Sequence, residues 1–138
     1  MASVIEMELI NNGSIAEQFI GQHLLFSGAI NDYEHSENLE LYYWMRQGRS
    51  NAEVDYLTVI DGIIYPIEVK AGAVGRLKSM HQFINEKSAL CGIRFTSNEP
   101  VIEKVKVKLP NGHAEYLLLT LPHYLVGQTN RLVRSIKD

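Results

Sequence analysis

This sequence of 138 residues has only one cysteine, no long apolar run and no excess of basic residues. The single cysteine, Cys91, excludes an internal disulfide, which indicates a reducing compartment. No run approaches the roughly 18 apolar residues of a membrane-spanning helix, and no basic segment leads into the apolar core of a signal peptide. We therefore expect a cytoplasmic protein with no membrane partner.

The charge balance gives no general attraction to polyanions. Lysine and arginine number 13, aspartate and glutamate 16, and the formal net charge is -3. Binding of nucleic acid would then depend on a local basic patch. The five histidines lack the spacing of a zinc site.

Hydrophobic residues make up 46% of the chain and charged residues 21%, as in ordinary globular proteins. This length supports one domain over residues 1–138. Because a helical pattern separates strand patterns, we expect an α/β fold with a mixed sheet and a crossover. The predicted elements are a helix over 15–26, a loop over 28–38, a strand over 39–45, a hairpin over 53–72, a helix over 75–87, a strand over 90–97, a hairpin over 101–125, and a short helix or frayed end over 126–138.

Ser14 and Glu17 form a capping box at the predicted start of the first helix. This box explains Glu17 without any functional role. Helical geometry nevertheless places Glu17 beside Ile20 and Leu24, on a partly apolar face where a carboxylate needs a partner. The sequence leaves both interpretations open.

The segment "EVDYLTVIDGIIYPIEVKAG", residues 53–72, holds the main candidate site. Its central Asp-Gly is the strongest short-range signal for a two-residue hairpin loop, and such a loop fixes the register. Counting outward, Asp55 lies opposite Glu68 in a non-hydrogen-bonded pair, where Cα atoms are roughly 4.5 Å apart. Two like charges so placed are destabilising unless a proton, a cation or a metal ion intervenes.

The same register sets Glu53 opposite Lys70, and period-2 alternation puts both on the face of the two carboxylates. If Glu53 engages Lys70, no cation remains for the acidic pair. Oxygen-rich sites of this kind suit Mg²⁺ or Mn²⁺. The alternative is a solvated strand face whose ion pairs are worth roughly 0 to 1 kcal/mol.

Lys104, Lys106 and Lys108 alternate with apolar residues on the first strand of the second hairpin. Edge strands carry such lysines to prevent aggregation, and contact with phosphates is the second interpretation.

Five segments occur in order, "GSIAEQFIGQHL", "LYYW", "EVDYL", "YPIEVKAG" and "LPHYL". Together they resemble the domain of unknown function found C-terminal to the ATPase module in a group of prokaryotic AAA-type ATPases. The D-(x)n-E-x-K pattern within them resembles the PD-(D/E)XK nuclease superfamily. The resemblance implies a restriction-endonuclease-like mixed β-sheet flanked by helices, in a C-terminal fragment of a larger ATPase or a domain that stands alone. No G-x-x-x-x-G-K-[ST] motif occurs, so nucleotide binding is not expected.

The resemblance also implies roles for individual residues. Asp55 and Glu68, with the backbone carbonyl of Val69, would hold Mg²⁺ or Mn²⁺. Lys70 would orient or activate the attacking water, and Glu17 corresponds to the glutamate of the first helix. The implied chemistry is metal-assisted hydrolysis of phosphodiesters.

Three functions remain open on this basis. The first is a metal-dependent nuclease acting on nucleic acid, with Gln82 as a further candidate near the metal. The second is a catalytically inactive module of the same fold that binds nucleic acid or protein and regulates an associated ATPase. The third is self-association as a homodimer through the "LYYW" strand.

Overall fold

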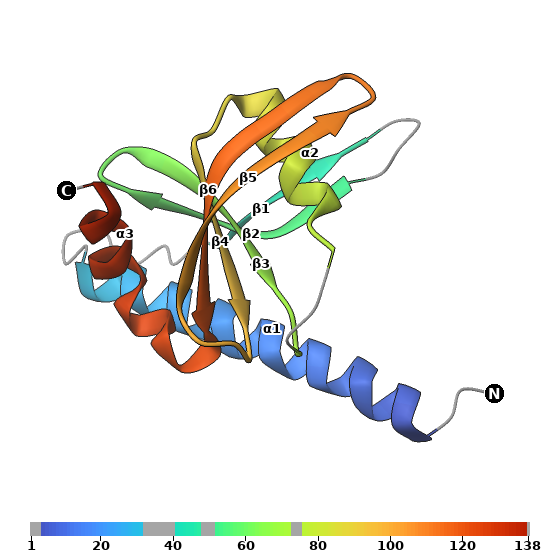
Figure 1. Ribbon diagram of the computed structural model, residues 1–138. Coiled ribbons are helices and arrows are strands. Elements are labelled where there is room, and N and C mark those ends of the chain that lie inside the picture. Colours follow the sequence, from blue (N-terminus) through green and yellow to red (C-terminus); the bar gives the residue numbers. More distant parts are fainter. Residues whose placement is uncertain (1–3, 32–40, 48–51, 73–75, 138) are drawn as a thin grey trace.

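The computed structural model describes residues 4–31, 41–47, 52–72 and 76–137. A long N-terminal helix comes first, and six strands follow it, interrupted once by a helix (Figure 1). The elements are α1 (Val4–Asn31), β1 (Tyr42–Arg46), β2 (Ala52–Ile60), β3 (Ile63–Val69), α2 (Lys78–Lys87), β4 (Cys91–Thr96), β5 (Val101–Leu109), β6 (Gly112–Pro122), the 3₁₀ helix η1 (His123–Gln128) and α3 (Thr129–Lys137).

The strands form one mixed sheet in the order β1-β2-β3-β4-β6-β5. The β3/β4 and β4/β6 pairs are parallel, and the others are antiparallel. Because β3 and β4 are parallel, the chain must cross from one end of the sheet to the other, and α2 makes this crossover. The predicted α/β fold with a mixed sheet is confirmed.

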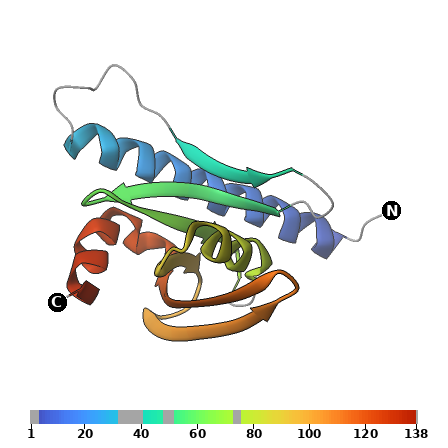
Figure 2. The ribbon, with the colours of Figure 1, turned by 90° about the horizontal axis from the view of Figure 1, so that it is seen from above.

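Helices cover both faces of the sheet. Helix α2 contacts all the strands from β2 to β6, whereas α1 contacts β2, β3 and η1. Figure 2 shows β2 and β3 between α1 and α2. Two cores result, one under α1, η1 and α3, the other under α2. Strand alternation assigns residues to them: Ile93 and Phe95 enter the first core, whereas Gly92 faces Met80, whose sulfur would lie 2.6 Å from an added Cβ.

The central hairpin forms as predicted. Asp61 and Gly62 have φ values of 53° and 77°, both in the left-handed region that a type I′ turn requires. The ladder starts at the pair Ile60↔Ile63 and places Leu57 opposite Pro66. That position does not bond across the hairpin, so the absent N–H of proline costs nothing within it. The second hairpin also closes as predicted, around Pro110-Asn111, and β5 is an edge strand.

The capping box at Ser14 and Glu17 is wrong. Helix α1 begins at Val4, so both residues lie inside it. The Asn-Gly before Ser14 indicated a break, but a glycine inside a helix costs only about 1 kcal/mol and does not by itself end the helix. Asn31, predicted in a loop, is still helical, and the rest of that loop lies outside the described residues.

The other helices differ from prediction only at their ends. Helix α2 starts at Lys78, and the predicted start, Gly75, lies outside the described residues. The C-terminal segment is ordered as η1 and α3, and its buried Val133 joins the first core. Among the helices described, α1 included, none is both long and apolar enough to cross a membrane.

Candidate functional site

Strand β2 contains a bulge at the predicted site. Tyr42 of β1 lies opposite Leu57, and Trp44, two residues later, lies opposite Val54. Two steps along β1 therefore match three along β2, and the extra residue falls in the segment that contains Asp55. The strict alternation predicted for β2 is interrupted at this point. Bulges are common next to active sites because they redirect a side chain.

The β2/β3 ladder stops at the same place. Its last pair is Tyr56↔Ile67, one step before Asp55 and Glu68. In a regular continuation, the Val69 N–H would bond a carbonyl of β2. It donates instead to Oδ2 of Asp55, at 2.7 Å. The Asp55 carboxylate thus replaces a backbone acceptor and lies between the two strands.

Glu68 is buried against this carboxylate, with 4% of its surface exposed. Burial, the negative charge of Asp55 and a hydrogen bond between the two side chains together raise the pKa of Glu68 to about 8, although Lys70 opposes the shift. Two carboxyl groups can form a hydrogen bond only if one is protonated, so the pair shares a proton at neutral pH. The proximity predicted for Asp55 and Glu68 is confirmed.

Lys70 lies beside this pair. Its Nζ is 3.7 Å from Oε2 of Glu68. The predicted engagement of Lys70 by Glu53 is wrong, because the ladder ends before it reaches that position. The backbone carbonyl of Lys70 accepts a hydrogen bond from Nε2 of His123, at 2.6 Å, and the Lys70 N–H donates to the Phe95 carbonyl of β4, at 2.9 Å.

Glu17 reaches the site from α1. The Tyr56 hydroxyl in the bulge donates to the Glu17 backbone carbonyl, at 3.0 Å, and the Tyr56 ring packs on Gly21. Burial raises the pKa of the Glu17 carboxyl, and the charges of Asp55 and Glu53 raise it further. The capping box is excluded, so the described neighbours of the Glu17 carboxyl are the acidic residues Asp55 and Glu53 and the cation Lys70.

A hollow of about 280 Å³ gives this site access to solvent. Its acidic members are Glu17, Glu53 and Asp55, and we call it the acidic hollow. Glu68 is not part of its lining, so the site is reached from the side of Asp55. The other lining residues are Leu41, Tyr42, Tyr43, Met45 and Tyr56.

The donor set fits a hard divalent cation bound by few protein ligands. The described part of the chain holds no group of three or more His, Cys, Asp or Glu side chains that could bind one metal ion. The ligands that the family resemblance implies include two such side chains, Asp55 and Glu68, with the Val69 carbonyl as the third. Mg²⁺ is commonly held by one or two carboxylates and keeps several waters. Such an ion would replace the shared proton as the charge between the two acids.

A family model described as "Domain of unknown function (DUF4143)" matches residues 12–111. The chain belongs to this family. The match covers the segment from α1 to the turn between β5 and β6, and includes Glu17, Asp55, Glu68 and Lys70. No curated protein and no solved structure matches the chain significantly. The broader part of the predicted resemblance, to a domain of unknown function, is confirmed.

In this DUF4143 domain Gln82 has a structural partner. Its side chain is buried, and its Oε1 accepts a hydrogen bond from Nη1 of Arg46, at 3.0 Å. Nε of the same arginine lies 3.1 Å from Oε1 of Glu86. These contacts join α2 to β1. Trp44 adds to the junction, because its ring meets the Phe83 ring edge to face at 5.5 Å.

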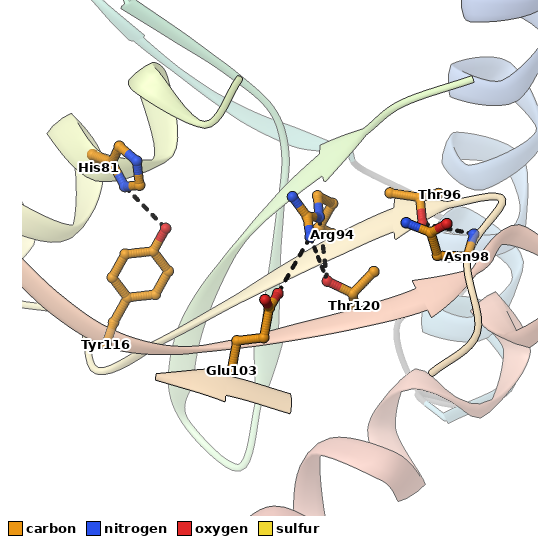
Figure 3. Close-up of polar contacts among 7 residues, drawn as sticks. All are labelled: His81, Arg94, Thr96, Asn98, Glu103, Tyr116 and Thr120. Atoms are coloured by element: carbon orange, nitrogen blue, oxygen red, sulfur yellow. Dashed lines mark hydrogen bonds and ion pairs between the residues drawn. The ribbon is translucent and has the colours of Figure 1, made fainter. Parts of the chain in front are cut away.

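A polar cluster beside Glu68 was not predicted from the sequence. Arg94, the ladder neighbour of Glu68 on β4, donates to Oγ1 of Thr120 at 3.0 and 3.2 Å (Figure 3). Its Nη2 also lies 3.4 Å from Oε2 of Glu103. The sequence signal was an arginine inside the apolar "LCGIRFTS" strand, because a charge in a buried strand needs a partner.

The α2 side of this cluster is closed by an uncharged pair. The hydroxyl oxygen of Tyr116 and Nδ1 of His81 are 3.0 Å apart (Figure 3). Burial lowers the pKa of His81. Burial also raises the pKa of Tyr116, with Glu68 among the smaller contributors. Two groups of polar contacts, Arg94 with Thr120 and Glu103, and Tyr116 with His81, thus lie on α2 and on the strands that follow that of Glu68 in the sheet.

Proposed function

We propose that this DUF4143 domain is a Mg²⁺- or Mn²⁺-dependent nuclease-like domain that hydrolyses phosphodiester bonds in nucleic acid. We further propose that the domain belongs to the PD-(D/E)XK nucleases, which have a restriction-endonuclease-like fold. The observation that carries the proposal is the convergence of Asp55, Glu68 and Lys70 where the β2/β3 ladder is broken. A buried acidic pair that shares a proton is costly to stability, which favours a functional role.

Each residue has a role in this proposal. Asp55 and Glu68 hold the ion together with the Val69 carbonyl. The ion stabilises charge on the phosphoryl oxygens and lowers the pKa of a water. Lys70 orients the attacking water, and its position is fixed because its backbone is bonded on both sides. Glu17 binds and orients water at the rim of the acidic hollow.

We also propose the setting in which the domain works. The family resemblance supports a cytoplasmic partner of the AAA-type ATPase class, with nucleic acid as the substrate. Co-purification of the full-length protein with DNA or RNA, lost after nuclease treatment, would support nucleic acid as the substrate.

The metal site is tested by calorimetry. Titration of Mn²⁺ into the wild type should show one site, and Glu68→Ala should remove it. Glu99→Ala is the matched control, because this glutamate is exposed between β4 and β5. If Glu68→Ala keeps all divalent-ion binding, the site is wrong.

Catalysis is tested separately with labelled single- and double-stranded DNA and RNA. Cleavage should require Mg²⁺ or Mn²⁺ and should be lost in Lys70→Met, while that variant still binds Mn²⁺. Equal cleavage by Lys70→Met and the wild type would show that the activity comes from a contaminant or another site.

A second candidate is a non-catalytic module of the same fold. Arg46 and Arg94, the two cations on the strands nearest the site, already contact Glu86 and Glu103. Cations so engaged are less available for phosphates, which favours this alternative. It predicts no cleavage of any nucleic acid with either ion, and unchanged cellular function when Lys70 is replaced.

Self-association is the third candidate and depends on β1. Tyr43 and Met45 of this edge strand are 59% and 49% exposed. Light scattering over a range of concentrations would show a dimer, and Tyr43→Asp should dissociate it.

A further inference from the structure

A groove of about 950 Å³ lies at the other end of β3 from the carboxylates. Its walls come from both faces of the sheet. Leu57 and Phe83 contribute from the α2 side, and Tyr65 and Val133 from the α3 side. Side chains of opposite faces can line one space only where the sheet itself is open. We call this groove the sheet slot.

The opening arises because β3 and β4 are not paired along their whole length. β3 begins at Ile63, but its pairing with β4 begins only at Ile67. On the far side of the slot, the segment before β4 bonds β6 instead, through the Leu90 carbonyl and the Leu117 N–H at 3.0 Å. The first three residues of β3, Ile63 to Tyr65, therefore have β2 on one side and the slot on the other.

This edge of β3 offers main-chain groups to a ligand. In a hairpin with a two-residue loop, the pair next to the loop, Ile60↔Ile63, is hydrogen-bonded. Alternation then turns the N–H and C=O of Ile64 away from β2 and into the slot. Pro66, the next residue of this parity, has no N–H, and its carbonyl faces β4 in the parallel pairing that begins at Ile67↔Ile93. The edge resembles that of sheets which accept an added strand.

We propose that the sheet slot binds an extended peptide segment of a partner protein, which adds as a strand beside β3 with apolar side chains at successive positions and acidic residues at its ends. A strand sends successive side chains to opposite faces, and both walls of the slot are apolar. Three residues of β3 provide about 10 Å of edge.

Charge complementarity specifies the ends of this peptide. Among the described residues that line the slot, the charged ones are Lys87 and Lys137, and none is a carboxylate. Lys87 lies in the last turn of α2 and Lys137 in that of α3, so the two cations come from opposite sides of the sheet. An acidic residue at each end of the peptide would meet one of them.

Exposed apolar surface supports a macromolecular occupant. Leu90 is 79% exposed, and Ile63 and Ile64 are 48% and 50% exposed. These side chains form the rim of the slot, where a peptide would cover them.

The test uses random dodecapeptides displayed on phage. They are selected on the wild-type protein and then measured as synthetic peptides by fluorescence anisotropy. The selected peptides should share an apolar run bounded by Asp or Glu. Leu90→Asp should weaken binding about tenfold or more, because it places a charge on the rim. Ile102→Asp is the matched control, since Ile102 is a half-exposed residue of the distant β5 edge.

Strand addition is tested by Ile64→Pro, which removes the N–H that faces the slot without removing a bond to β2. Circular dichroism verifies its fold. Affinity should fall about tenfold or more, the loss expected for a main-chain hydrogen bond plus steric obstruction. Reversal of both slot lysines to glutamate should also weaken binding, whereas Lys104→Glu with Lys108→Glu should not.

Three results would overturn the proposal. They are failure to enrich any peptide, peptides that bind Leu90→Asp and Ile64→Pro as well as the wild type, and a concentration-dependent dimer that Leu90→Asp abolishes, which would make a second copy the occupant. Glu68→Ala should leave peptide binding unchanged, so this test is independent of the proposed nuclease function.

Discussion

Replacement of Glu68 by glutamine should change how the stability of the metal-free protein depends on pH. Glutamine keeps the volume of the side chain and its capacity to hydrogen-bond to Asp55, but it cannot ionise. In the wild type, burial and the neighbouring Asp55 raise the pKa of Glu68 from 4.5 to about 8. The folded state therefore binds the Glu68 proton more tightly than the unfolded state does.

The sign follows from this difference in proton affinity. The stabilisation from Glu68 is complete below pH 4.5 and is lost as the pH rises toward 8, because the buried acid must then ionise beside Asp55. Each pKa unit corresponds to about 1.4 kcal/mol, so the free energy of unfolding should fall by roughly 3 to 5 kcal/mol from this group across the interval. Lys70, 3.7 Å away, limits the loss.

Urea denaturation at intervals between pH 5 and pH 8, with a chelator present, measures the effect. Wild type and Glu68→Gln should differ little in stability at pH 5, and the variant should become the more stable as the pH rises. Glu115→Gln, on the exposed side of β6, should run parallel to the wild type. Parallel curves for Glu68→Gln and the wild type would refute the shared proton.

Three further outcomes are expected. Gly21→Ala should lower the stability measured in a thermal melt by about 1 to 3 kcal/mol, because the added Cβ would lie 2.5 Å from the Tyr56 hydroxyl. Gly13→Ala, with open space around it, should instead raise the stability by about 0.5 to 1 kcal/mol. Equal effects would contradict the packing of α1 on β2. Mn²⁺ at about 100 times its dissociation constant should stabilise the wild type by about 2.7 kcal/mol and leave Asp55→Ala unchanged, so an equal rise of both melting temperatures would place the ion elsewhere. Because burial raises the pKa of the Cys91 thiol, a disulfide reagent should modify it more slowly in the folded protein at neutral pH than in denaturant, and equal rates would show that the thiol is not protected by the fold.

The hairpin could be predicted from local sequence rules. A two-residue loop with two left-handed positions admits one register, and apolar alternation agrees with it. The pairing from Ile60↔Ile63 to Tyr56↔Ile67 could therefore be counted from the turn. The proximity of Asp55 and Glu68 followed from the same count, since a bulge displaces a residue by little.

Tertiary contacts decided what the sequence could not. The bulge is set by the pairing of β2 with β1, a strand that the turn does not constrain. The continuation of α1 through Gly13 depends on the packing of the helix, with Gly21 seated on Tyr56, rather than on local capping signals. The predicted partner of Lys70, Glu53, was wrong for the same reason. The Lys70 backbone is bonded to β4 and to His123, which are distant in sequence.

The two ends of β3 show how one strand serves two different surfaces. At its C-terminal end β3 leaves β2, and the gap is filled by a side chain, the carboxylate of Asp55 bonded to the Val69 N–H. At its N-terminal end β3 is not yet paired with β4, and within the described residues no other strand lies beside Ile64 on that side. A sheet edge left in this way is a liability unless something pairs with it. The first gap places an acidic pair where a cation can bind, and the second favours an external strand, so a change at one end should leave the other intact.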